Sequence, residues 1–161
     1  MHKAVAMAQM YPVIRETLQA GGTVTLTSTG ASMMPMLRHG EDTVTLEPAV
    51  GVLRINDIVL YRRDNGQFVL HRIVGMDQNG DYILRGDNQL TLEHHVRRQQ
   101  VIGRLLAFTR KGRRIACTSV RYKAYVCLLP VLRALKPEFR WINRHMRGFG
   151  CFIRRREKEN G

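Results

Sequence analysis

The sequence is poor in cysteine. Its 161 residues include three cysteines, Cys117, Cys127 and Cys151, all in the last third of the chain. Three is an odd number, and the spacings match no metal knuckle. We therefore expect neither a disulfide framework nor a structural metal, and we expect a reducing compartment. Buried free thiols are the expected form of these side chains.

The sequence also lacks an apolar run long enough to span a bilayer. Outside the N-terminus the longest run, residues 124–132, has nine residues and includes Pro130. The N-terminal apolar segment is interrupted by Gln9 and then by Arg15 and Glu16, which argues against a signal peptide or a membrane span. We expect a cytoplasmic or peripherally membrane-associated protein.

Acidic side chains are scarce in the last part of the chain. Residues 1–96 carry 8 basic and 10 acidic side chains, whereas residues 97–161 carry 18 basic and 3 acidic ones. The net charge of +13 therefore resides in the second segment, which predicts an anionic partner or surface for that segment alone. The apolar content of 44% and charged content of 24% are typical of one globular domain.

Alternation of polar and apolar residues predicts a mainly β, antiparallel domain over residues 23–118. A helical period and a Gly-Gly stop predict an N-terminal helical segment over residues 1–22. The period is helical again over residues 119–161, where arginines alternate with apolar residues in a basic amphipathic extension. About seven short strands are expected, over residues 23–28, 43–47, 57–61, 67–74, 82–85, 101–108 and 113–118.

A serine among small residues follows the first expected strand. Ser32 comes directly after Gly30 and Ala31 and directly before Met33. Small neighbours let a substrate backbone approach a hydroxyl closely, and backbone N–H groups at such a junction can bind an oxyanion. The alternative interpretation is an ordinary N-cap serine of a short helix, which is favoured when the match is taken alone.

A serine nucleophile needs a base, and the domain has no lysine between Lys3 and Lys111. Among its histidines, His71 lies in an apolar strand, where a neutral imidazole can accept a proton near pH 7. Asp87, in a Gly-Asp-Asn turn, and Glu93 are the carboxylates that could orient this ring. The alternatives are an inert, hydrogen-bonded core histidine and an aspartate that caps its own turn.

Five short motifs follow one another along the expected β domain. They are Ser32-Met33-Met34-Pro35, Asn56-Asp57-Ile58-Val59, His71-Arg72-Ile73-Val74, Gly86-Asp87-Asn88 and Val101-Ile102-Gly103-Arg104. These motifs resemble those of type I signal peptidases, in the order in which that family carries them. The histidine motif is similar to that of the endoplasmic-reticulum and archaeal branch, which uses histidine where the bacterial branch uses lysine. One such match is weak, but five in order over residues 23–108 are a specific signal.

The resemblance implies a β-rich peptidase fold, shared with self-cleaving phage and SOS repressors. It implies a serine endopeptidase that cleaves signal or leader peptides through an acyl-enzyme, acting on a peptide or preprotein substrate without cofactor or metal. Ser32 would be the nucleophile, His71 the general base and Asp87 the orienting acid, with Glu93 as an accessory candidate. The chain departs from the family at Gly30, which is often serine, at Met34, which is commonly an acid, and in having no membrane anchor.

The basic segment leaves other interpretations open. Residues 120–161 could meet an anionic membrane surface in place of an anchor, or could form a helical cap with a solvated basic face. An alternative for the whole chain is a basic nucleic-acid- or membrane-binding regulatory protein with an inactive peptidase fold. Nucleic acid is the less favoured partner, because the repressor relatives need a lysine base and a DNA-binding domain. Residues 1–22 are too short for a helix-turn-helix.

Overall fold

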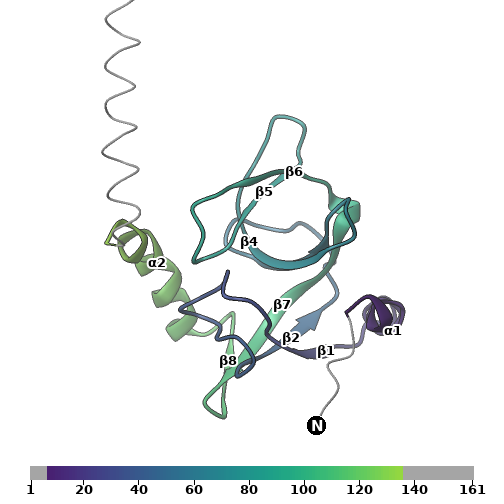
Figure 1. The fold of residues 1–161 in the computed structure, drawn as a ribbon, viewed down its shortest axis with the longest axis horizontal. Coiled ribbons are helices and arrows are strands. Elements are labelled where there is room, and N and C mark those ends of the chain that lie inside the picture. The colour runs from purple at the N-terminus through teal and green to yellow at the C-terminus, as the bar shows by residue number, and fades with distance from the viewer. Residues whose placement is uncertain (1–6, 136–161) are drawn as a thin grey trace, which may run out of the picture. The chain divides into compact units, whose positions relative to one another are not determined.

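The structure, a computed structural model, describes residues 7–135. These residues form a mainly β fold, an eight-strand antiparallel sheet with one helix before it and one after it (Figure 1). The helices are α1 (Met7–Gln19) and α2 (Val120–Ala134). The strands are β1 (Val24–Thr27), β2 (Thr43–Glu47), β3 (Ile58–Arg62), β4 (Phe68–Met76), β5 (Tyr82–Arg85), β6 (Glu93–Val96), β7 (Val101–Arg110) and β8 (Arg113–Ala116).

Strand β7 connects the two halves of the sheet. The strand order is β1-β2-β7-β3-β4-β5-β6, and β8 pairs with β7 outside this path. Figure 1 shows β7 running from the curved layer of β4, β5 and β6 toward β2 and β8. In the β3–β4 pair, Val59 lies opposite His71 and Tyr61 lies opposite Val69. Because side chains alternate along a strand, Tyr61 and His71 share one face of the sheet.

The sequence patterns located seven of the eight strands. The strand that they missed is β6, whose residues Glu93-His94-His95-Val96 are too polar to show an alternation. It forms because it pairs with β5, with Leu84 opposite Glu93 and Tyr82 opposite Val96. β6 is also an edge strand of the sheet, and edge strands tolerate polar side chains. This omission matters, because Glu93 lies in the candidate site.

The predicted helices are present in the described residues. Helix α1 ends two residues before Gly21, whose φ of 82° favours glycine and closes the helix. Helix α2 begins at Val120, one residue after the predicted boundary, with Ser119 Oγ accepting the Tyr122 N–H. Most of the predicted basic extension, residues 136–161, lies outside the described residues. In residues 7–135 neither helix has the length and apolar run that a bilayer crossing requires.

The main core lies within the β3–β6 half of the sheet. Its side chains are buried, and Tyr61, which is 0% exposed, places a polar hydroxyl among them. The chain divides into two compact units, Met1–Lys123 and Ala124–Gly161, and the whole sheet belongs to the first. The core side chains are Leu53, Val59, Tyr61, Ile73, Tyr82, Leu84 and Val96.

Candidate active site

Ser32 lies in a series of turns between β1 and β2. The Met34 N–H donates to the Ala31 carbonyl at 3.2 Å, and the Leu37 N–H donates to the Met33 carbonyl at 3.0 Å. These turns do not continue into a helix, because the next N–H, of Arg38, donates to the Asp42 carboxylate at 2.9 Å instead. The interpretation of Ser32 as a helix N-cap is therefore wrong.

The Gly86-Asp87-Asn88 turn holds the backbone of the serine loop. The Asn88 N–H donates to the Ser32 carbonyl at 2.8 Å, and the Asn88 side-chain amide donates to the Ala31 carbonyl at 3.1 Å. A Cβ at Gly86 would lie 2.6 Å from the Ser32 carbonyl oxygen, so no other residue fits there without displacing the serine. Gly86 and Asn88, two residues of the predicted Gly86-Asp87-Asn88 motif, thus position Ser32.

Ser32 and His71 line one cavity of about 310 Å³. His71 is 2% exposed and Ser32 is half-buried. The Nε2 atom of His71 is buried and has no hydrogen-bond partner among residues 7–135. The alternative interpretation of His71 as an inert, hydrogen-bonded core histidine leaves this nitrogen unexplained. The Ser32 hydroxyl is not bonded to Nε2 in this structure; catalytic contacts are often loose before substrate binds.

A chain of hydrogen bonds determines which His71 nitrogen carries the proton. The Tyr61 hydroxyl donates to Glu93 Oε2 at 2.6 Å, and its oxygen lies 3.2 Å from His71 Nδ1. The single proton of the hydroxyl is used by Glu93, so the oxygen can only accept from an Nδ1–H group. The neutral ring then has its lone pair on Nε2, the atom that is buried without a partner. This tautomer is the one that a general base at the cavity requires.

Burial keeps the His71 ring neutral, and hydrogen bonds keep Glu93 ionised. Burial lowers the pKa of His71 to about 4, against the opposing charge of Glu93. Burial works to raise the pKa of Glu93, but hydrogen bonds from Arg63 and Tyr61 leave it below its usual value. The Arg63 guanidinium binds both carboxylate oxygens, at 2.8 and 2.6 Å. Burial and the bond to Glu93 raise the pKa of Tyr61, so its hydroxyl remains a donor.

Asp87 is paired with an arginine. Arg72, on the opposite face of β4 from His71, donates to both Asp87 oxygens, at 2.8 and 2.7 Å. Arg72 is 0% and Asp87 1% exposed, and Arg72 Nη1 also donates to the Tyr122 hydroxyl at 2.8 Å. Arg72 thus binds both carboxylate oxygens of Asp87. Its predicted role at His71 stays a prediction, whereas Glu93, the second carboxylate that the sequence singled out, is joined to His71 through Tyr61.

The residues around Ser32 differ in what they line or contact. Gly30 and Met33 line the cavity, and Ala31 is exposed with its carbonyl held by Asn88. The Gly30 N–H donates to Nδ1 of His39 at 2.8 Å, so this N–H is already occupied. Ser28 and Thr29 also line the cavity.

Sequence reasoning missed Tyr61 and Arg63. Tyr61 lies in β3, in a segment that the sequence predicted only as a buried strand, and Arg63 directly follows the end of β3. A signal was present in the spacing, because Val59 and Tyr61 share a face and β4 follows β3 as the next strand. The partner Glu93, however, is 32 residues from Tyr61 in sequence, and no local pattern brings them together.

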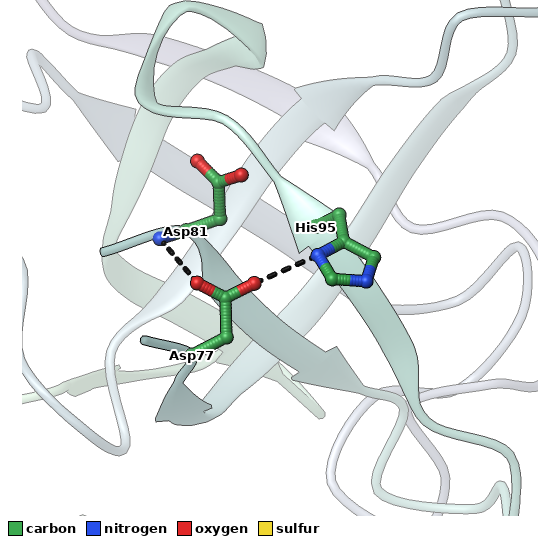
Figure 2. A group of neighbouring side chains, drawn as sticks. All are labelled: Asp77, Asp81 and His95. Carbon is green, nitrogen blue, oxygen red and sulfur yellow. Dashed lines mark hydrogen bonds and ion pairs between the residues drawn. The ribbon is translucent and has the colours of Figure 1, made fainter. Parts of the chain in front are cut away.

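A second cluster of polar side chains lies away from the cavity, at the β4–β5 turn. Figure 2 shows Asp77, Asp81 and His95, whose ligand atoms all lie within 4.8 Å of one another. One Asp77 oxygen accepts the N–H groups of Asn79 and Asp81 at 2.9 and 3.0 Å, and the other contacts His95 Nδ1 at 2.8 Å. These bonds close the turn and attach β6 to it, which accounts for the cluster without a ligand.

The cavity is lined by Ser32, whose loop is held by hydrogen bonds from Asn88, and by His71, whose Nε2 is unprotonated and has no partner among the described residues. A hydroxyl beside such a base can become a nucleophile, with the base in turn oriented by a third group. No model of a known protein family and no curated protein matches the chain. The geometry of Ser32, His71, Tyr61 and Glu93 is therefore the basis for assigning a function.

Proposed function

We propose that the protein is a serine endopeptidase of the type I signal peptidase kind, with Ser32 as nucleophile and His71 as general base. The observation that carries the proposal is His71, which lines the same cavity as Ser32 and whose buried Nε2 has no hydrogen-bond partner among the described residues. A buried polar atom without a partner is costly for the fold. A base that receives a proton from Ser32 during the reaction gives a reason for that cost.

The mechanism assigns the proton transfers to Nε2. The Ser32 oxygen forms a bond to the scissile carbonyl carbon while its proton moves to Nε2. The tetrahedral intermediate collapses to an ester, and the departing amine takes the proton from Nε2. Water then attacks the ester carbon and loses a proton to Nε2. The bond between that carbon and the Ser32 oxygen breaks, the acid product leaves, and the Ser32 oxygen takes the proton back from Nε2. A pKa of about 4 keeps the ring unprotonated at neutral pH, and the developing oxyanion favours its protonated form.

Tyr61 and Glu93 would stabilise the imidazolium that forms in each step. Its Nδ1–H donates to the Tyr61 oxygen, which is polarised by the ionised Glu93 behind it. Because the Gly30 N–H is occupied by His39, the Ser28 hydroxyl and the Ser32 N–H are the candidate donors for the oxyanion. Ser28 is 7% exposed and lines the cavity.

The substrate proposed for this site is an extended peptide, such as a signal or leader segment. Strand β1 pairs with β2 on one side and is the first strand in the sheet order, so its other edge can accept a further strand. The segment after β1, residues 28–30, lines the cavity beside Ser32. A strand added along β1 would therefore run toward the nucleophile.

The test is covalent labelling by a serine-reactive probe suited to signal peptidases, followed by intact mass. We expect one label on the wild type, none on Ser32→Ala, and labelling of His71→Ala slowed by about 10²–10⁴-fold, the range for loss of a general base. His94→Ala is the matched control, since His94 is exposed on the edge strand β6, and it should label normally. Wild-type labelling rates in a folded Ser32→Ala or His71→Ala protein would refute the proposal.

A further inference from the structure

Four cationic side chains surround a cavity at the β7–β8 hairpin. The cavity has a volume of about 590 Å³ and is lined by Arg110, Lys111, Arg113, Arg121 and Ile115. The residues come from the end of β7, the turn, β8 and the first turn of α2, so the fold collects them from separate elements. We call these four basic residues the cationic cluster. The only other side chain that lines the cavity is apolar.

The cationic cluster has no internal compensation among residues 7–135. No carboxylate in that part of the chain forms an ion pair with Arg110, Lys111, Arg113 or Arg121. Arg110 and Arg113 lie directly opposite each other in the β7–β8 ladder, where like charges destabilise the pair. Arg104, earlier in β7, by contrast pairs with Glu47 at 2.6 Å. An anion from outside would relieve the repulsion within the cluster.

The cluster is attached to the serine loop. Arg110 Nη1 donates to the carbonyl oxygens of Pro35 and Met36, at 2.6 and 3.4 Å. Its charge also acts on the buried Asp42, whose carboxylate already pairs with Arg38 at 2.8 Å. Arg110 is thus held in one orientation, while the exposed Lys111, Arg113 and Arg121 can follow a ligand.

Exposed apolar residues are neighbours in sequence of the cluster and of its contact in the serine loop. Val120, next to Arg121, is 83% exposed, and Met34, next to the Pro35 that Arg110 binds, is 40% exposed. Cations mixed with exposed aliphatic side chains suit a lipid headgroup region, where each faces its own layer. Surfaces that bind single-stranded nucleic acid add aromatic side chains on which bases stack, and the lining of this cavity has none among the described residues.

We propose that the cationic cluster binds the phosphate headgroups of an anionic phospholipid surface. Residues 110–121 would then be a peripheral membrane-binding site on the folded domain, next to the loop that carries Ser32. This proposal does not depend on the chemistry of Ser32, because it rests on the charges and exposure of the hairpin alone.

The test is co-sedimentation of the full chain with vesicles of phosphatidylcholine containing 30% phosphatidylglycerol, a fraction chosen as roughly that of an anionic leaflet. We expect Arg113→Glu/Arg121→Glu to weaken binding by about tenfold or more, because each basic residue near such a surface contributes to affinity. The matched control is Arg15→Glu/Arg54→Glu, which changes the charge equally at two exposed arginines outside the cluster and should bind at least severalfold more tightly than the cluster variant.

The cluster variant gives a second readout, its thermal midpoint without vesicles, that a merely structural role would not produce. Its Arg113→Glu substitution replaces the repulsion with Arg110 by attraction, so this midpoint should equal or exceed that of the wild type. Equal vesicle binding by the cluster variant and the control would overturn the proposal. So would a cluster variant that keeps vesicle binding but loses binding to a labelled DNA duplex, which would assign the cluster to nucleic acid instead.

Discussion

At the scale of single residues, the site depends on which His71 nitrogen is free. The Tyr61 hydroxyl has one proton, and Glu93 takes it at 2.6 Å. That single bond leaves Tyr61 oxygen as an acceptor for Nδ1–H and leaves Nε2 free to act as a base. Arg63 keeps Glu93 ionised from the other side, with contacts of 2.8 and 2.6 Å. Tyr61 is thus a positioning residue, acting on the reaction only through His71.

Replacing Tyr61 by phenylalanine tests this role. The variant removes the acceptor of the Nδ1–H group, and loss of a partner that orients a functional histidine typically costs about 10–100-fold in activity. We expect the maximal labelling rate to fall by that factor while the half-saturating probe concentration stays unchanged. Tyr82→Phe is the matched control, because Tyr82 is in the same core but its hydroxyl accepts from Arg98. Equal labelling rates in the two variants would contradict the role.

At the scale of elements, strand β4 serves the site with both of its faces. His71 faces the cavity, and the next residue, Arg72, faces the opposite side, where it pairs with Asp87. Asp87 in turn belongs to the turn that binds the Ser32 carbonyl through Asn88. The buried ion pair therefore connects the strand that carries the base to the loop that carries the nucleophile. Arg72 also donates a hydrogen bond to the hydroxyl of Tyr122, at the start of α2.

Breaking this pair should destabilise the fold. Asp87→Asn leaves the buried Arg72 charge uncompensated, which costs about 3–5 kcal/mol in the free energy of unfolding. Asp64→Asn breaks the Arg97–Asp64 pair, whose side chains are 56% and 81% exposed, and should cost at most about 1 kcal/mol. Urea unfolding measures both values. A loss for Asp87→Asn no larger than that for Asp64→Asn would show that Arg72 finds another way to be neutralised.

At the scale of the whole molecule, three buried or partly buried titratable groups make stability fall as the pH is lowered from neutral. The pKa of His71 is lowered by burial, and the pKa values of Glu93 and Asp42 are lowered by their arginine partners despite burial. In each case the unfolded chain binds a proton at a higher pH than the folded protein does. Stability is therefore greatest above the unfolded pKa values and is lost as the pH falls.

The share of His71 in this loss can be isolated. Its pKa of about 4, against about 6.5 in an unfolded chain, corresponds to about 3 kcal/mol lost between pH 6.5 and pH 4. We expect His71→Asn to reduce the loss in unfolding free energy over that interval by about this amount, measured by urea unfolding at several pH values. His94→Asn, at an exposed position, should keep the wild-type slope. Parallel curves for all three proteins would mean that His71 takes up protons freely in the folded state.

The sequence by itself determined the secondary structure and the residue types of the site. Alternation located seven strands because each buries one face against the core, and local turn residues such as Gly21 marked where helices end. The absence of lysine from residues 4–110 directed attention to His71, and the Gly-Asp-Asn motif directed it to Asp87. These inferences depend on periodicity and composition over short stretches, which the chain carries locally.

Only the tertiary structure decided which carboxylate serves which partner. Asp87 and Glu93 are both close to His71 in sequence, yet one pairs with Arg72 and the other reaches the ring through Tyr61. The sequence patterns did not predict strand β6, because its residues do not alternate between polar and apolar. Its position is set by pairing with β5. The cationic cluster likewise exists only once β7, β8 and α2 meet. Pairings between distant residues depend on the register of the strands, and short sequence patterns carry no information about it.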